Sequence, residues 1–158
     1  MKVRDIMRPI ISVDSAGTAY DASQLMVKYY SGCILVENNK TVLGIITESD
    51  FMRVVTKEQV SPSEINVNQL MSQPLKSIGP DATIEEAAIV MKTENIRRLP
   101  VLERDRFIGL VDASDVLDVA FGRGRRQEGG ELQERRSEDI IFKAQHSHHL
   151  IAEVTKRS

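Results

Sequence analysis

The chain has 158 residues, a length that fits one domain or two small ones. Hydrophobic residues make up 41% of it, which is enough for a packed core and argues against wholesale disorder. The net charge of -2 makes nucleic acid an unexpected partner. With Cys33 as its one cysteine, the chain forms neither an internal disulfide nor a Cys-x-x-Cys metal site, so a reducing cytoplasm is the expected location.

The sequence also argues against a membrane protein. No stretch approaches the roughly 18 uninterrupted apolar residues that a membrane-spanning helix needs. At the N-terminus, Asp5 and Pro9 interrupt the region in which a signal peptide would place its apolar run. We therefore expect a soluble, cytoplasmic protein with no membrane partner.

The strongest organisational feature is an internal duplication. Val3 and Met7 match Val67 and Met71, and a shift that differs by one residue superposes a longer series of identical residues. Because the matches share one register and one hydrophobic pattern, they indicate two repeats of one structural unit. The superposed pairs are Pro9 and Pro74, Thr18 and Thr83, Ala22 and Ala87, Met26 and Met91, Val36 and Val101, Gly44 and Gly109, Ser49 and Ser114, and Asp50 and Asp115.

A helix is predicted early in each repeat. In the second repeat Thr83 and Glu86 have the spacing of a capping box, in which each side chain accepts a hydrogen bond from the other residue's backbone N–H. Thr18 and Asp21 take the same roles in the first repeat. Apolar residues then recur at helical spacing. They are Ala22, Leu25, Met26 and Tyr29 in the first repeat and Ile84, Ala87, Ala88 and Met91 in the second.

Extended segments surround each predicted helix. Polar turns at 37–40 and 103–106 join two short strands in each repeat into a hairpin. Pro100 is expected at the edge or end of its strand, because proline has no N–H to donate. The extended starts cover 3–13 and 67–78, the strands cover 33–36, 42–47, 98–101 and 107–111, and the second helices begin near Asp50 and Asp115.

These elements give the order β-α-β-β-α twice and predict an α+β (α/β) fold. One repeat of about 55 residues would bury too little surface to be stable by itself. We therefore expect two repeats packed sheet-to-sheet with pseudo-twofold symmetry around a shared core. The predicted domains are 1–60 and 61–121, followed by a tail over 122–158.

At this point the sequence resembles a known family, the CBS domain. Gly44-Ile-Ile-Thr-Glu-Ser-Asp50 resembles the family's strand followed by Thr-x-x-Asp at a helix start, and 109–115 fits with one departure. Ile96-Arg-Arg-Leu-Pro-Val101 resembles the family's second strand. The resemblance covers roughly residues 1 to 120. It implies a tandem pair, or Bateman module, that binds AMP, ADP, ATP or a related adenosyl ligand between its repeats and forms a disc-shaped homodimer.

The residues at the implied site suit the parts of a nucleotide. Asp50 is an acceptor for the ribose hydroxyls, since an ionised carboxylate has two accepting oxygens. Thr47 caps the helix or binds ribose or phosphate, and by family analogy Arg97 and Arg98 reach phosphates from the other repeat. We predict that these four residues share one site. The full predicted set is Ile45, Ile46, Thr47, Asp50, Ile78, Thr83, Arg97, Arg98, Leu99, Pro100 and Asp115.

The second half-site departs from the family pattern. Asp112 stands where the family usually has Thr or Ser, so a second carboxylate repels phosphate and no hydroxyl is offered. Asp115 remains able to accept from a ribose. The facing strand, 31–35, lacks both arginines and the proline. This half-site therefore either prefers adenosine-like ligands or stays empty.

Each of these features also has a simpler interpretation. Taken alone, Thr47-x-x-Asp50 is more typical of a helix cap than of a ligand site. Arg97 and Arg98 are alternatively ordinary solvated charges. Gly44 and Gly109 are expected to serve strand packing, and Cys33 is expected to be a small buried residue.

The tail differs in character from the repeats. Residues 122–130 predict a flexible basic linker, and 131–158 are either partly helical or disordered. An apolar stripe in this region favours a short helix that docks on a partner. All three histidines, His146, His148 and His149, lie there without the cysteines that would complete a metal site, so no metal is expected.

The sequence thus predicts a regulatory sensor that binds an adenine nucleotide and acts on an unidentified effector protein. Mg²⁺ could accompany ATP, and S-adenosylmethionine is a less favoured ligand. The alternative is a ligand-free interaction module that dimerises through its repeats. No catalytic residue is assigned, because the chain has no nucleophile–base pair, no P-loop and no Gly-x-Gly-x-x-Gly.

Overall fold

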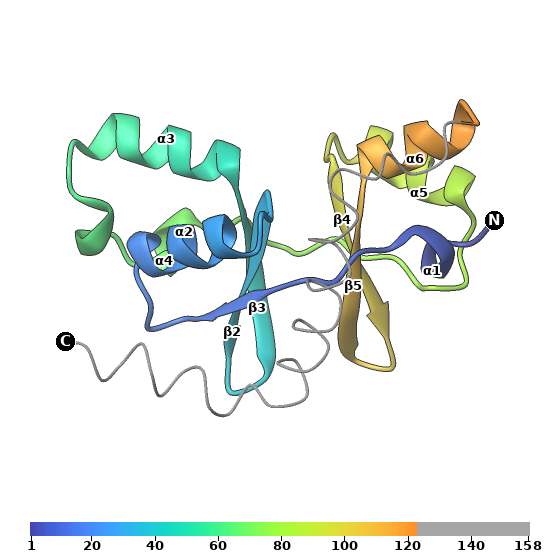
Figure 1. Cartoon of the computed structure of the whole chain (residues 1–158). Helices are drawn as coiled ribbons and strands as arrows, with labels where there is room; N and C mark the ends of the chain where they lie inside the picture. The colour runs from blue at the N-terminus through green and yellow to red at the C-terminus, as the bar shows by residue number, and fades with distance from the viewer. Residues whose placement is uncertain (123–158) are drawn as a thin grey trace. The chain divides into compact units, whose positions relative to one another are not determined.

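A computed structural model describes residues 1–122, and the predicted linker and tail lie outside this part of the chain, apart from Gly122 (Figure 1). The described chain divides into two compact units. One unit, here called the Asp50 unit, consists of residues 11–75. The other, the Asp115 unit, combines residues 1–10 with residues 76–122. No helix among the described residues is long and apolar enough to cross a membrane.

The Asp50 unit contains a three-stranded sheet in the order β1-β2-β3. Strand β1 runs parallel to β2, and β2 pairs with β3 in an antiparallel hairpin. The core of this unit consists of buried residues from its three strands, from α2 and from α4, among them Ala22, Ile34, Ile46, Val67 and Leu70, and α3 packs partly buried side chains against it. The elements are β1 (Ser12–Asp14), α2 (Ala19–Lys28), β2 (Cys33–Asn38), β3 (Thr41–Thr47), α3 (Glu48–Glu58), the 3₁₀ turn η1 (Pro62–Glu64) and α4 (Val67–Leu70).

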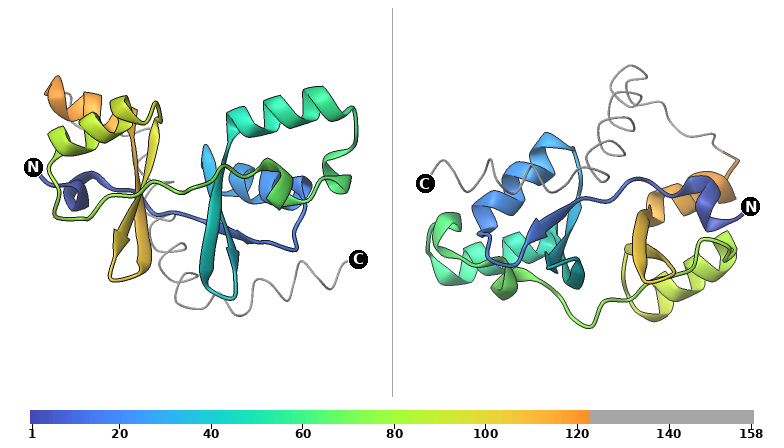
Figure 2. Two further views of the ribbon diagram at one scale, coloured as in Figure 1. Left: turned by 180° about the vertical axis from the view of Figure 1, so that it is seen from behind. Right: turned by 90° about the horizontal axis from the view of Figure 1, so that it is seen from below.

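The Asp115 unit repeats this arrangement with a two-stranded sheet, β4-β5. A single parallel bridge between Ile78 and Val101 takes the place of the first strand. Helices α5 and α6 contact each other (Figure 2), and the core includes Val3, Ile6 and Leu99. The elements are α1 (Val3–Ile6), α5 (Ile84–Thr93), β4 (Arg98–Glu103), β5 (Arg106–Asp112) and α6 (Ala113–Ala120).

Local signals in the sequence explain most of these elements. Thr18 and Thr83 are the N-caps of α2 and α5 and form the predicted capping boxes. Both hairpins turn through two residues of positive φ, at 39–40 and 104–105, as a two-residue turn with the right twist requires. Pro100 lies inside β4, which is an edge strand because its sheet has two strands.

The predicted extended start of each repeat is wrong in its first residues. Both starts form a helical turn, in α1 and in α4. The backbone N–H of Lys2 donates to the Asp5 carboxylate at 2.7 Å, and the N–H of Asn66 donates to the Gln69 side chain at 2.9 Å. These local hydrogen bonds close the turn, and the two apolar residues of each turn are buried in a core.

Candidate functional site

Asp50 is a nearly buried carboxylate at the start of α3. Thr47 is the N-cap of this helix, and Asp50 is its third residue. The Thr47 backbone N–H and hydroxyl both donate to Oδ2 of Asp50, at 2.8 and 2.9 Å. The side chain is held in one orientation by these two bonds, with 6% of the residue exposed. The predicted pair of Thr47 and Asp50 is thus together, and it performs the capping role.

The other oxygen of Asp50 has partners that the sequence interpretation did not identify. Arg53 donates to Oδ1 from Nη2 at 2.9 Å, and the Ser72 hydroxyl lies 3.3 Å from the same oxygen. Arg53 lies three residues along the same helix, a spacing that places two side chains on one face and could have predicted the pair. Ser72 is distant in sequence and comes from the start of the second repeat.

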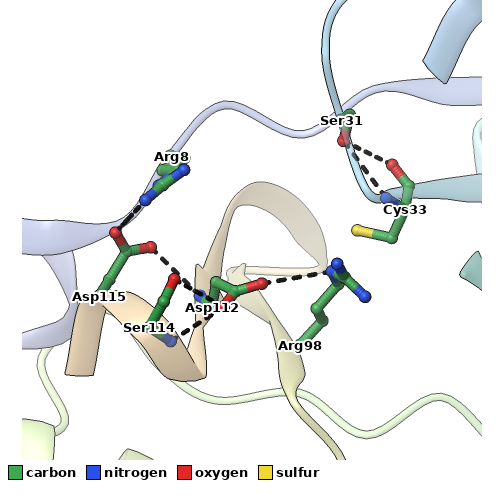
Figure 3. A network of polar contacts seen from close by, with 7 residues as sticks. All are labelled: Arg8, Ser31, Cys33, Arg98, Asp112, Ser114 and Asp115. Atoms are coloured by element: carbon green, nitrogen blue, oxygen red, sulfur yellow. Dashed lines mark hydrogen bonds and ion pairs between the residues drawn. The ribbon is translucent and has the colours of Figure 1, made fainter. Parts of the chain in front are cut away.

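Asp115 occupies the equivalent position in α6 and has a different partner. Arg8 donates to Oδ1 of Asp115 from both Nε, at 3.0 Å, and Nη2 (Figure 3). The backbone N–H of Asp112 lies 3.4 Å from Oδ2. Asp115 is 4% exposed. The chain therefore supplies a cation, Arg8, to a nearly buried carboxylate.

Asp112 is itself engaged within the Asp115 unit. It caps α6 by accepting from the Ser114 backbone N–H at 2.9 Å and from the Ser114 hydroxyl at 2.8 Å. Its Oδ2 forms an ion pair with Nε of Arg98 at 3.3 Å (Figure 3). Arg98 is therefore neutralised by a neighbouring carboxylate, whereas Arg97 is exposed and its side chain makes no ion pair among residues 1–122.

The remaining predicted residues fall into core and surface groups. Ile46 and Leu99 are fully buried in the cores of their units, so their side chains are committed to packing. Ile45 and Ile78 are half-buried, and Pro100 is buried. Thr83 is exposed, and its hydroxyl accepts from the Glu86 N–H at 3.1 Å as a helix cap. Thr47 and Asp50 belong to one unit, and Arg97 and Arg98 belong to the other. That these four residues share one binding site stays a prediction.

Two glycines bring the opening segments against the strands. A Cβ atom on Gly44 would lie 2.8 Å from the Ser72 carbonyl oxygen, and one on Gly109 would lie 2.9 Å from the Arg8 carbonyl oxygen. Backbone bridges pair Ser72 with Ile45 and Arg8 with Leu110. The absence of a side chain at each glycine thus lets Ser72 and Arg8 come close to the helix-start carboxylates.

The described residues offer no metal site. No group of three or more His, Cys, Asp or Glu side chains in residues 1–122 has the arrangement to hold a metal ion. Cys33 is buried, as predicted, and its carbonyl oxygen accepts from the Ser31 hydroxyl at 2.7 Å (Figure 3). The three histidines lie beyond residue 122, outside the described part.

Comparison with known proteins identifies the repeats. The model of the CBS domain family matches twice, at residues 3–57 and 67–122. A protein of Methanopyrus kandleri is 32% identical over 71% of the chain and 58% of its own length. The CBS domain-containing protein YhcV of Bacillus subtilis is 29% identical over 72% of the chain and 81% of its own length. The chain spans about three fifths of the first of these relatives.

Solved structures show the same fold. A protein with CBS domains from Burkholderia ambifaria superposes with a TM-score of 0.73 at 26% identity, over 82% of this chain and 100% of that one. The CBS domain pair of protein MJ0100 superposes with a TM-score of 0.70 at 21% identity, over 78% of this chain and 98% of that one. That pair was solved in complex with 5′-methylthioadenosine and S-adenosyl-L-methionine.

Proposed function

Since the chain belongs to the CBS domain family and carries two such domains in tandem, we propose that it is a regulatory module that binds an adenine nucleotide. The observation that carries this proposal is the arrangement at Asp50. One oxygen of the carboxylate is fixed by Thr47, and the other accepts from the Ser72 hydroxyl and from Arg53. A ribose diol offers the same kind of donor as the serine hydroxyl, so a nucleoside can replace it at this oxygen.

Arg53 supports the nucleotide form of the ligand. Its side chain is 53% exposed, so it can leave Asp50 without leaving solvent and turn towards a phosphate. Arg97, exposed immediately before β4, is proposed as a second cation, as the sequence predicted. AMP, ADP and ATP are accordingly the proposed ligands, with Mg²⁺ accompanying ATP.

The adenosyl ligands of the MJ0100 domain pair support the same chemical class. They share the adenine base and the ribose ring with AMP, and the ribose carries the hydroxyls that Asp50 is proposed to bind. S-adenosylmethionine is therefore the comparison ligand for any titration. The regulatory output would pass to an effector protein of the cytoplasm, with the module acting as a homodimer and performing no catalytic step itself.

The test is a calorimetric titration of the whole chain and of Asp50→Asn with AMP, ADP, ATP and S-adenosylmethionine. Asparagine keeps the shape of the side chain but removes one charged acceptor. Hydrogen bonds to a charged group contribute about 1.5–3 kcal/mol, so the affinity should fall by at least about tenfold. Asp105→Asn is the control, because Asp105 is exposed in a hairpin turn whose positive φ asparagine tolerates.

Both variants should stay folded, since Asp50→Asn weakens one capping interaction, at a cost of about 1 kcal/mol, and Asp105 is exposed in a turn. Circular dichroism checks this before the titration. If Asp50→Asn is folded and binds every ligand with the affinity of the wild type, the assignment of Asp50 as the ribose acceptor is wrong.

One observation favours a second candidate function. Both helix-start carboxylates already accept hydrogen bonds from their own units, as they would in a ligand-free interaction module that dimerises through its repeats. A ligand that binds the native state raises its thermal midpoint. No shift with any of the four ligands at millimolar concentration would support this second function over the first.

A further inference from the structure

Ser72 and Arg8 hold the same place in the two units. Each follows the methionine that ends an opening turn, and each forms a backbone bridge to the strand that carries the close-packed glycine. Each also directs its side chain to the carboxylate at a helix start, Ser72 to Asp50 and Arg8 to Asp115. The two sites thus share a geometry and differ in chemistry, with a neutral hydroxyl in one and a guanidinium in the other.

The two carboxylates differ in what remains when the arginine leaves. Without Arg53, Asp50 still accepts from the Thr47 N–H, the Thr47 hydroxyl and the Ser72 hydroxyl. Without Arg8, the hydrogen bond that Asp115 retains within residues 1–122 is the longer one from the Asp112 N–H, because Asp112 has no hydroxyl. A nearly buried carboxylate with one weak donor is costly, so Asp115 depends on Arg8.

The neighbouring charges strengthen this dependence. Asp112 places a second carboxylate beside Asp115, and Arg98 neutralises it. The charges of two carboxylates and two arginines of the Asp115 unit therefore cancel. A neutral ribose diol can replace the hydrogen bonds of Arg8 but not its charge, so exchange of Arg8 for a nucleoside is unfavourable.

We propose that Arg8 is a specificity-determining residue that occupies the Asp115 half-site from within the chain, so that adenine nucleotide binds at Asp50 and not at Asp115. The inference rests on the proposed function, because it assumes that the helix-start carboxylates accept the ribose. It assigns a cause to the inequality of the two half-sites: the cation on residue 8, where the other unit has a serine.

The experiment converts each site into the other. Arg8→Ser gives the Asp115 unit the residue of the Asp50 unit, and Ser72→Arg makes the opposite change. Both variants and the wild type are titrated with AMP and, separately, with ATP by calorimetry. We expect the wild type to bind one nucleotide per chain, Arg8→Ser to bind a second, and Ser72→Arg to bind at least about tenfold more weakly than the wild type.

Arg4→Ser is the matched control. Arg4 lies in the same opening segment and is also about half exposed, but it pairs with Asp81 and Glu103. This variant should bind one nucleotide with the affinity of the wild type. The double variant Arg8→Ser, Asp115→Asn should lose the second binding event, because Asp115 is the acceptor that Arg8→Ser releases.

The outcomes separate the inference from the function on which it rests. A wild type that binds two nucleotides, or a folded Arg8→Ser variant that still binds one, overturns the inference and leaves the proposed function standing. If Arg8→Ser does not fold, an unchanged affinity in Ser72→Arg overturns the inference in its place. If no variant and no wild type binds AMP or ATP, the proposed function fails, and the inference fails with it.

Discussion

Asp50 and Asp115 show how one position can be used in two ways within a duplicated fold. Each is the third residue of a helix and is nearly buried, so each carboxylate needs hydrogen-bond donors from the chain. Asp50 receives two of its donors from the threonine that begins the helix. The helix of Asp115 begins at an aspartate, Asp112, and Asp115 accepts from the cation Arg8 instead. Asp112 stands where the other unit has Thr47, and the two units accordingly differ both in the helix cap and in the partner of the carboxylate.

Asp81 carries a carboxyl whose pKa departs clearly from its ordinary value. Hydrogen bonds from the Lys2 ammonium and then from the Arg4 guanidinium lower the pKa of its carboxyl below the ordinary value. Since the folded pKa is the lower one, the stabilisation is present above the unfolded pKa, near 4, and is lost as the pH falls through the folded value. These ion pairs tie the opening segment to the loop before α5.

We predict that Asp81→Asn lowers stability at neutral pH by a small amount, because Asp81 and its two partners, Lys2 and Arg4, are all exposed. The difference from the wild type should be constant between pH 6 and 8 and should close as the pH falls below about 4. Urea unfolding of both proteins at pH 7 and pH 3 measures it. A difference of equal size at both pH values would show that the carboxylate charge is not the cause.

The sequence predicted part of the site at this scale. Thr47 and Asp50 were identified because their spacing is local, and a helix start brings them together whatever surrounds it. Arg53 was within reach of the same argument. Ser72 and Arg8 were not, because their contacts depend on which strand the opening segment pairs with, and no local pattern encodes that pairing.

At the scale of elements, the hairpins and longer helices followed from sequence because caps and turn residues are local signals. The short helical turns were missed for a physical reason. A run of four residues with two apolar members fits a strand and a helical turn equally well. In α1 the deciding contact is a backbone N–H of Lys2 with Asp5, and lysine is not among the preferred N-cap residues.

Substitutions at Gly44 and Gly109 test whether the opening segments lie close against the strands. We predict that Gly44→Ala and Gly109→Ala each lower the free energy of unfolding by about 1–3 kcal/mol, since overpacking forces the backbone to shift. The atom met first is a carbonyl oxygen in both cases, so no side-chain rotation relieves the contact. Chemical denaturation followed by circular dichroism measures the change.

Gly79→Ala is the control for this pair, because a Cβ atom there meets nothing within 4 Å. Its unfolding free energy should change by less than about 0.5 kcal/mol or rise slightly, as the unfolded chain becomes less flexible. If Gly44→Ala and Gly109→Ala behave like Gly79→Ala, the opening segments do not lie against the strands as described.

At the scale of the whole molecule, the compact units differ from the sequence repeats. Residues 1–10 open the first repeat but belong to the unit that holds most of the second. Val3 and Ile6 are buried in its core, whereas Val67 and Leu70 are buried in the core of the Asp50 unit. The duplication could not reveal this exchange, because the two opening segments match in sequence and either assignment satisfies the hydrophobic pattern.

This exchange of opening segments predicts which hairpin loses stability when a core residue of an opening segment is substituted. Ile6→Ala removes a side chain that packs in the core with Leu99 and Val101, so the β4–β5 hairpin should lose protection from amide hydrogen exchange. Leu70→Ala, its counterpart, should expose the β2–β3 hairpin instead. Each change should cost about 2–5 kcal/mol, as expected for a large-to-small substitution in a core. Exchange measured by mass spectrometry on both variants distinguishes the hairpins. If Ile6→Ala instead exposed β2–β3 first, the opening segment would belong to its own repeat, and Arg8 would not be held beside Asp115.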